Sequence, residues 1–365
     1  MDPRIEDHAR IITEHSVDLG AGDEVLVVAP PVAEDLVVAL RERVGERGAH
    51  AITFSRSARA RRAFMRAMDP DDYETPPDAL MALAEEVDVA IIVRASRNTH
   101  ETGDVAPEKN AAYAQVMQPF RDEIIDERWV GTQHPAPGNA QDAEMSTEAY
   151  ADFVYDAVTK DWEAQERFQA QMVELLDAAS EVRVVSGDAT DLTMSVDGMV
   201  TENDNAEHNL PGGEVFTAPV PDSVEGEVLF DMPLMAQGRE VEDVRLVFEG
   251  GEVVEFEAAK HEDVLASVLG TDEGASRLGE LGIGMNREID RFTYNMLFDE
   301  KMGDTVHMAL GRAYEMNVPE DRERNDSAVH QDVIVDMSDE SRIELDGEVV
   351  QRNGTFVFED DFDAV

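Results

Sequence analysis

The segment GDEVLVVAPP, residues 22–31, is a short apolar run with turn-forming residues at both ends. This pattern is typical of a strand buried on both faces. Apolar residues then recur at helical spacing over residues 32–44, and Gly45 ends that pattern. Residues 51–54 repeat the strand pattern. A strand, a helix and a second strand in this order predict a right-handed crossover within a mainly parallel sheet.

The same alternation continues along the first half of the chain, with a helix predicted over residues 80–86 and a strand over 87–93. A long helical pattern over residues 147–179 could connect two domains. We therefore predict an N-terminal α/β domain, residues 1–178, that includes this connecting helix. The turn after its first strand, residues 29–31, contains no glycine to admit a pyrophosphate, so this domain is expected to be a scaffold rather than a dinucleotide site.

The remaining residues, 179–365, predict a β-rich α+β domain. Short alternating segments separated by glycine-containing turns are typical of antiparallel strands. Residues 249–251, Glu-Gly-Gly, are expected to close a hairpin. The predicted strands cover residues 182–185, 192–196, 227–230, 245–248 and 253–256.

The composition excludes several classes of function. The chain has 365 residues, with 81 acidic and 30 basic side chains and a net charge of −51. A surface this negative repels phosphate backbones and anionic lipids, so we expect neither nucleic acid nor membrane as a partner. The apolar fraction of 42% is enough for packed cores. Because there is no cysteine, any metal site must use His, Asp, Glu, Tyr or water.

The basic residues comprise only four lysines against 26 arginines. Acidic excess with scarce lysine is typical of proteins that work in concentrated salt, where self-repulsion is screened within about 3 Å at 1 M. We therefore hypothesise a halophilic source. The first residues lack the basic and apolar regions of a signal peptide, and no apolar run is long enough to span a bilayer, which favours a cytoplasmic location.

Two of the nine histidines lie in strand-like segments. His307 lies in an apolar alternating stretch over residues 304–311, and His330 lies in a similar stretch over residues 328–335. His330 and Asp332 are two residues apart, so on a strand both point to the same face. Imidazole beside carboxylate suits Zn, Co, Mn or Mg. The simpler interpretation is an Asp–His hydrogen bond on a sheet.

Two acidic residues have unusual surroundings. Glu214 follows the turn Pro211-Gly212-Gly213 and begins an otherwise apolar strand, and Glu280 has three glycines around it within residues 279–284. Glycines flanking an acid indicate a close backbone approach rather than a solvated surface. A buried carboxylate needs compensation, and a cation supplies it most simply. Glu300, by contrast, is expected to pair with Lys301 or a nearby arginine.

Two other hydrolase classes lack their motifs. No Gly-x-Ser-x-Gly segment is present, which argues against a serine hydrolase. The pair His261-Glu262 is not followed by a histidine at the spacing of a single-zinc protease.

Four segments in order, residues 209–219, 279–286, 298–311 and 330–332, together resemble the M29 family of metallo-aminopeptidases, of the aminopeptidase T and aminopeptidase S type. The resemblance implies an α/β N-terminal lobe, a second lobe that carries two divalent ions, an enclosed cavity and a homodimer. It also implies a set of metal ligands and, seven residues after His307, a site tyrosine that acts as ligand and catalytic group. The residues implied are Glu214, Glu280, His307, Tyr314, His330 and Asp332.

The donor chemistry agrees with this resemblance, because these oxygen and nitrogen donors suit two ions bridged by a carboxylate or water. The resemblance implies a metal-dependent aminopeptidase that removes the N-terminal residue of small peptides by means of a two-metal-activated water. Tyr314 would stabilise the oxyanion, and Glu214 or Glu280 would carry the proton to the leaving amine. Two alternatives stay open: Tyr314 packed in the core, and a non-enzymatic, metal-stabilised protein that binds a small ligand.

Overall fold

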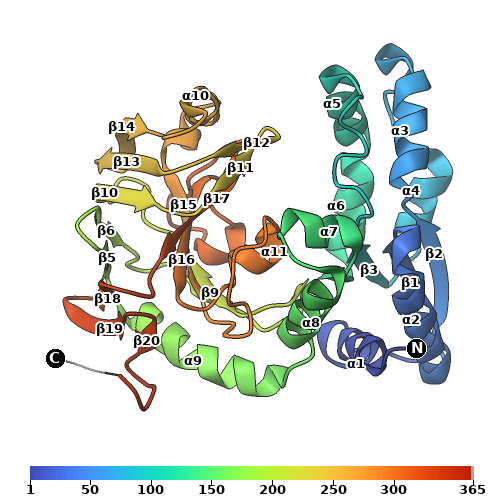
Figure 1. Ribbon diagram of the computed structural model, residues 1–365, viewed down its shortest axis with the longest axis horizontal. Helices are drawn as coiled ribbons and strands as arrows, with labels where there is room; N and C mark the ends of the chain where they lie inside the picture. Colours follow the sequence, from blue (N-terminus) through green and yellow to red (C-terminus); the bar gives the residue numbers. More distant parts are fainter. Residues whose placement is uncertain (363–365) are drawn as a thin grey trace. The chain divides into compact units, whose positions relative to one another are not determined.

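The computed structural model describes residues 1–362 and divides into two compact units (Figure 1). Unit 1 contains Met1–Lys160 and Ala206–Gly212, and unit 2 contains Asp161–Asn205 and the described chain from Gly213 onward. The two units correspond to the expected α/β and β-rich regions. The division after residue 178 differs, because the helix before it lies in unit 2. The last three residues of the expected second domain lie outside the described residues.

Unit 1 is built on a five-stranded sheet in the order β2-β1-β3-β4-β8, in which every pair is parallel. This confirms the predicted fold class. The strands predicted over 24–29, 51–54 and 87–93 are β1, β2 and β3. The bounds are β1 Glu24–Ala29, β2 His50–Ser55, β3 Val89–Arg94, β4 Arg128–Gln133 and β8 Asn209–Leu210.

Helices pack on both faces of this parallel sheet because both faces of β1 are apolar. Leu26 and Val28 contact the apolar residues of α4 and α6, whereas the alternate residues Val25 and Val27 are buried on the other face, where α2 contacts β1. The helices of unit 1 are α1 Pro3–Ile11, α2 Glu34–Arg47, α3 Ala58–Ala67, α4 Asp78–Ala84, α5 Pro107–Val116, α6 Gln118–Asp126, α7 Pro137–Asp142 and α8 Thr147–Val158.

The helical pattern over 147–179 forms two helices rather than one. Helix α8 ends at Val158, where the Thr159 hydroxyl donates to the Tyr155 carbonyl at 2.6 Å. Helix α9, Trp162–Ala178, begins at Asp161, whose carboxylate accepts from the backbone N–H of Ala164 at 3.0 Å. This N-cap divides the segment at the boundary between the units.

Unit 2 contains two larger antiparallel sheets and a two-stranded ribbon. The large sheet has the order β14-β13-β10-β6-β5-β18-β19-β20, and the second, which we call the site sheet, has the order β17-β16-β15-β9-β7. The strands of the large sheet are β5 Glu181–Ser186, β6 Thr190–Ser195, β10 Glu225–Phe230, β13 Val244–Glu249, β14 Glu252–Glu257, β18 Ser341–Leu345, β19 Glu348–Arg352 and β20 Thr355–Phe356. The hairpin predicted at 249–251 joins β13 to β14.

The site sheet and the remaining elements complete unit 2. The ribbon pairs β11 with β12. Their bounds are β7 Glu202–Asp204, β9 Glu214–Thr217, β11 Leu234–Ala236, β12 Arg239–Val241, β15 Leu278–Gly284, β16 Thr305–Gly311, β17 His330–Asp336, α10 Glu262–Leu269 and α11 Met296–Asp299. One face of the site sheet packs into the core of unit 2 through residues such as Leu281, Met308 and Val333.

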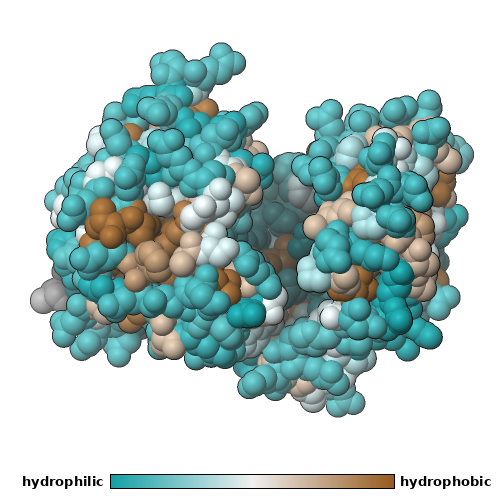
Figure 2. Space-filling model, turned by 90° about the horizontal axis from the view of Figure 1, so that it is seen from above, coloured by the Kyte–Doolittle hydropathy of each residue, from teal (hydrophilic) through white to brown (hydrophobic). Residues whose placement is uncertain are grey.

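Polar residues dominate the part of the surface that is visible in Figure 2. On the face that Figure 2 shows, hydrophilic residues cover most of the area and hydrophobic residues form patches. Among residues 1–362, no helix has the length and apolar composition that crossing a bilayer requires.

Candidate metal centre

The second face of the site sheet carries all five of the predicted glutamate, histidine and aspartate ligands. Glu214 begins β9, Glu280 lies in β15, His307 lies in β16, and His330 and Asp332 lie in β17. Neighbouring residues such as Val306 and Met308 point into the core, so strand alternation directs His307 to the opposite face. The predictions that residues 304–311 and 328–335 form strands, and that Glu214 begins one, are confirmed.

A bulge directs Glu280 to this face. The pairing of β15 with β16 shifts between Leu278 and Glu280, so that both Leu278 and Leu281 enter the core although they are three residues apart. Gly279 is the extra residue, and a Cβ atom there would lie 2.2 Å from the Gly311 carbonyl oxygen. The close backbone approach predicted around Glu280 is therefore confirmed.

Small residues lie opposite the polar side chains. Across β15, β16, β9 and β17, Gly284 pairs with Glu214, Gly282 with His307, and Ala309 with both Glu280 and Asp332. A Cβ atom at Gly282 would lie 2.0 Å from the His307 ring. The sheet thus leaves space on this face for the five side chains to approach one another.

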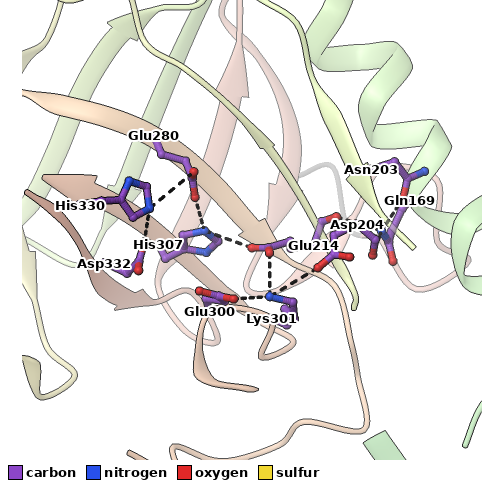
Figure 3. A network of polar contacts seen from close by, with 10 residues as sticks. All are labelled: Gln169, Asn203, Asp204, Glu214, Glu280, Glu300, Lys301, His307, His330 and Asp332. Atoms are coloured by element: carbon purple, nitrogen blue, oxygen red, sulfur yellow. Dashed lines mark hydrogen bonds and ion pairs between the residues drawn. The ribbon is translucent and has the colours of Figure 1, made fainter. Parts of the chain in front are cut away.

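The side chains form one connected cluster (Figure 3). His307 Nε2 lies 3.1 Å from Glu280 Oε1 and 3.2 Å from Glu214 Oε2. His330 Nε2 lies 3.5 Å from Asp332 Oδ1 and 4.0 Å from Glu280 Oε2. One ligand atom from each of Glu280, His307 and Asp332 lies within 4.8 Å of the other two, which suits a single ion.

Burial distinguishes these acids from the others. Among the described residues, the acidic side chains that are buried are Glu214, Glu280 and Asp299, and two of these three are predicted ligands. Glu214 Oε2, Glu280 Oε2 and Asp332 Oδ1 are buried and accept no hydrogen bond. Buried acceptors of this kind are costly unless a cation satisfies them.

A buried lysine lies beside the cluster. The Lys301 side chain is 0% exposed, and its Nζ lies 2.8 Å from Glu214 Oε1 and 3.5 Å from Asp204 Oδ2. It also pairs with Glu300, as predicted. Neither Lys301 nor Asp204 was among the predicted site residues. Lysine is scarce in this chain and Lys301 lies near the apolar residues Phe298 and Met302, which was a sequence signal for a buried lysine. The sequence around Asp204 contains no such signal.

Helix α9 fixes the strands that hold Glu214. The Gln169 amide donates to the backbone carbonyls of Glu214 at 2.9 Å and Asp204 at 3.1 Å. Gln165 donates to the Met285 carbonyl at 3.0 Å, just beyond β15. These bonds tie α9 to the site sheet, which explains why this helix lies in unit 2.

The electrostatics show an excess of negative charge. Burial raises the pKa of the Glu214 carboxyl, against the opposing charge of Lys301. Burial and the charge of Glu300 likewise raise the pKa of Asp332 to about 6. Burial alone would lower the pKa of His307, but Glu214 and Glu280 outweigh it and raise that pKa to about 9. The cluster therefore favours additional positive charge.

Tyr314 lies at the edge of the cluster. Strand β16 ends at Gly311, whose φ of 101° requires glycine, and Tyr314 follows in a loop before the short 3₁₀ helix η5, Glu315–Asn317. Its ring centroid lies 4.7 Å from that of His330, and the side chain is 37% exposed rather than packed in the core.

The comparisons with known proteins agree with one another. Residues 1–358 match the family model described as thermophilic metalloprotease (M29). Aminopeptidase 2 of Geobacillus stearothermophilus is 27% identical over 98% of each chain, and Aminopeptidase T of Thermus thermophilus is 28% identical over 96% of this chain and 95% of its own. The solved structure of wild-type AmpT from Thermus thermophilus superimposes with a TM-score of 0.87 at 25% identity, covering 97% of this chain and 99% of that one.

Proposed function

Because the chain belongs to the M29 family of metalloproteases and is thus a peptidase, we propose that it is an aminopeptidase that removes the N-terminal residue of small peptides with the help of two divalent metal ions. The observation that carries this proposal is the set of three buried carboxylate oxygens, from Glu214, Glu280 and Asp332, that accept no hydrogen bond around His307.

The residues present fit a divalent ion. Carboxylate and imidazole donors without thiolate suit Zn, Co, Mn or Mg. Glu280, His307 and Asp332 would hold one ion, and Glu214 and His330 extend the donor set on either side. Tyr314 adds a further donor beside His330. Bound ions would polarise the scissile carbonyl and lower the pKa of a water molecule toward about 7.

The cluster and its neighbours Asp204, Glu300 and Lys301 form one polar network (Figure 3). The charge of this network supports two ions rather than one. Its five carboxylates carry five negative charges when ionised, and Lys301 supplies one positive charge. The four remaining negative charges equal the charge of two divalent ions. A single ion would leave two buried charges uncompensated, which is costly away from water. The carboxylates are those of Asp204, Glu214, Glu280, Glu300 and Asp332.

The chain's own groups would divide the remaining work. The Tyr314 hydroxyl would donate to the oxygen that gains charge in the transition state. In the metal-free protein its partial burial, with the negative charges of Glu280 and Asp332, raises the pKa of Tyr314 well above its usual value. Glu214 or Glu280 would carry the proton to the leaving amine.

The test is release of an amino acid from a chromogenic amide of that amino acid. We expect release by the protein in molar salt, loss of release after a chelator, and recovery on addition of divalent metal. Glu280→Gln, which keeps the shape of the side chain, is expected to lose most of the activity. Release that a chelator leaves unchanged would refute the metal mechanism.

A second substrate tests the direction of cleavage. An aminopeptidase that reads the free α-amine is expected to refuse the N-acetylated form of a peptide that it otherwise cleaves. Equal cleavage of both forms would contradict the assignment. If metal binds and neither peptide is cleaved, the alternative of a metal-stabilised binding protein would be favoured.

We also propose that the protein forms a homodimer. Light scattering of the purified chain in molar salt measures its mass directly, and a monomeric mass at micromolar concentration would contradict this proposal.

A further inference from the structure

We propose that Lys301 is a positioning residue of the metal centre, whose ammonium holds Glu214 by Oε1 so that only Oε2 is presented to a metal ion. The inference rests on the proposed function, since it assigns Glu214 a single-oxygen contact with a divalent ion.

The surroundings of Lys301 match the donors of an ammonium group. Its ammonium has three N–H donors, and its Nζ forms ion pairs with three carboxylates, one each from Asp204, Glu214 and Glu300. The side chain is fully buried, so no water competes for these contacts. Figure 3 shows the ammonium between Glu214, Asp204 and Glu300, with Glu214 in contact with both Lys301 and His307.

The backbone fixes the point from which the side chain starts. The N–H of Lys301 donates to the Phe298 carbonyl at 2.9 Å, and its carbonyl accepts from the N–H of Asn286 at 3.1 Å. Asn286 lies two residues beyond the end of β15, which carries Glu280. The ammonium is therefore held relative to two strands of the site sheet, β9 through Glu214 and β15 through the backbone.

The two oxygens of Glu214 have different roles as a result. Oε1 is 2.8 Å from Lys301 Nζ, whereas Oε2 accepts no hydrogen bond and lies 3.2 Å from His307 Nε2. A carboxylate fixed through one oxygen offers the other in one orientation. Partners of this kind typically change metal affinity by about 10–100-fold when removed.

If Lys301 acted through its charge alone, its removal would change the metal affinity in the opposite direction. A positive charge near a metal ion repels it, so removing the charge of Lys301 should tighten metal binding if the residue only neutralises its neighbours. If Lys301 orients Glu214, removing it should weaken metal binding. The direction of the change in metal affinity therefore distinguishes the two roles.

The experiment measures binding of Zn²⁺ or Mn²⁺ alone to the metal-free full-length protein by calorimetry in molar salt, together with the metal-induced rise in melting temperature. For Lys301→Met we expect at least about 10-fold weaker metal binding and a smaller metal-induced rise. At saturating metal, kcat is expected to fall more than KM rises, because Glu214 stays misoriented.

Two control variants separate this effect from others. Lys260→Met makes the same chemical change at a lysine that pairs with Glu240 and Glu242 at 2.5 and 2.6 Å but is 41% exposed in its side chain. Asp299→Asn perturbs a buried residue of α11 whose carboxylate accepts hydrogen bonds from Thr293 and Asn295 in the preceding loop. Both are expected to bind metal as the wild type does, even where Asp299→Asn lowers the melting temperature.

The outcomes decide between the possibilities. Unchanged or tighter binding by Lys301→Met overturns this inference and leaves the proposed function intact, whereas absence of binding by the wild type refutes the proposed function itself. If Lys301→Met does not fold, Lys301→Gln, which keeps a neutral donor, is measured instead with the same expected loss. Failure of both to fold would assign Lys301 a purely structural role and also overturn the inference.

Discussion

Tyr314 presents a hydroxyl beside the carboxylates that raise its pKa, namely Glu280 and Asp332. Tyr314→Phe keeps the ring and its contact with His330 but removes this donor. Loss of one donor to an oxyanion typically lowers kcat by about 10²–10³. We expect a fall of this size with the melting temperature and most of the bound metal retained, measured by steady-state kinetics and metal analysis of the same preparation.

Each other outcome for Tyr314 has a distinct meaning. Near-normal turnover in Tyr314→Phe would show that the hydroxyl takes no part in the reaction. Equal loss of metal and activity would make the phenol oxygen a metal ligand. Tyr155→Phe is a suitable control because Tyr155 is buried in α8 of unit 1, whereas the cluster belongs to unit 2.

At the level of residues, motif spacing predicted the side chains that lie on strands. His330 and Asp332 share a face because strands alternate, and the glycines around Glu280 signalled the close approach that the structure has. Asp204 and Lys301 could not be found in this way. Their approach to Glu214 depends on the pairing of β7 with β9 and on the loop after α11, both of which are tertiary.

In the site sheet, the absence of a side chain at Gly282 of β15 leaves room for the His307 ring. Gly282→Ala would place a Cβ atom 2.0 Å from the His307 ring, and this side chain can shift more easily than backbone. We expect His307 to move away from Glu280 and Glu214, with metal affinity lowered by at least about 10-fold and only a modest loss of melting temperature. Calorimetric titration of metal into the two proteins measures this.

Substitutions of two further glycines serve as controls for this experiment. At Gly284 of the same strand, an added Cβ would lie 2.0 Å from the Met302 carbonyl, so Gly284→Ala is expected to destabilise the fold more strongly. At Gly45 of α2 nothing lies within 4 Å, and Gly45→Ala is expected to stabilise the protein by about 0.5–1 kcal/mol without affecting metal binding. Wild-type metal affinity in Gly282→Ala would mean that the ring position is not required.

A buried histidine, His8, connects α1 to β4 by a hydrogen bond. His8 is fully buried and its Nε2 lies 2.7 Å from the Thr132 hydroxyl, which itself donates to the Leu210 carbonyl at 2.8 Å. His8 is therefore the donor through Nε2, and its buried Nδ1 has no partner. Burial, with a smaller contribution from His134, lowers the pKa of His8 to about 3.

The sign of the pH effect follows from this lowered pKa. Above about pH 6.5 His8 is neutral in both states, and as pH falls toward about 3 only the unfolded chain gains the proton, so stability is lost. Between pH 7 and pH 5 this loss is about 2 kcal/mol. Urea unfolding at the two pH values is expected to show a smaller change for His8→Gln, which keeps an amide donor. An identical change in both proteins would contradict the buried neutral state.

At the level of elements, apolar runs predicted β1 and β3 because strands buried on both faces are continuous in sequence. The short apolar segment of β2 was predicted too, although β2 is an edge strand whose residues are largely exposed. The helical pattern over 147–179 concealed the break between α8 and α9, although Asp161 is an N-cap residue of the expected type. Helices α3, α5 and α6 were not predicted, since their apolar positions are few and α5 shows almost no amphipathic pattern.

For the whole molecule, the net charge of −51 sets the dependence on salt. In dilute buffer the Debye length is about 30 Å at 0.01 M, so acids across a unit repel one another, whereas at 1 M it is about 3 Å and only adjacent charges interact. The many surface ion pairs, such as Arg183 with Asp191, offset only part of this repulsion, because 81 acids face 30 basic residues.

We therefore expect the melting temperature to rise by at least about 5 °C between 0.01 M and 1 M KCl, equivalent to roughly 4 kcal/mol for a chain of this size. Chloride is the suitable anion because sulfate would stabilise any protein by exclusion from its surface. Sucrose at equal osmolality controls for exclusion, since it does not screen charge, and it is expected to give a smaller rise. A melting temperature that KCl leaves unchanged, or that sucrose raises equally, would refute the halophilic interpretation, because screening is the only one of these effects that requires ions.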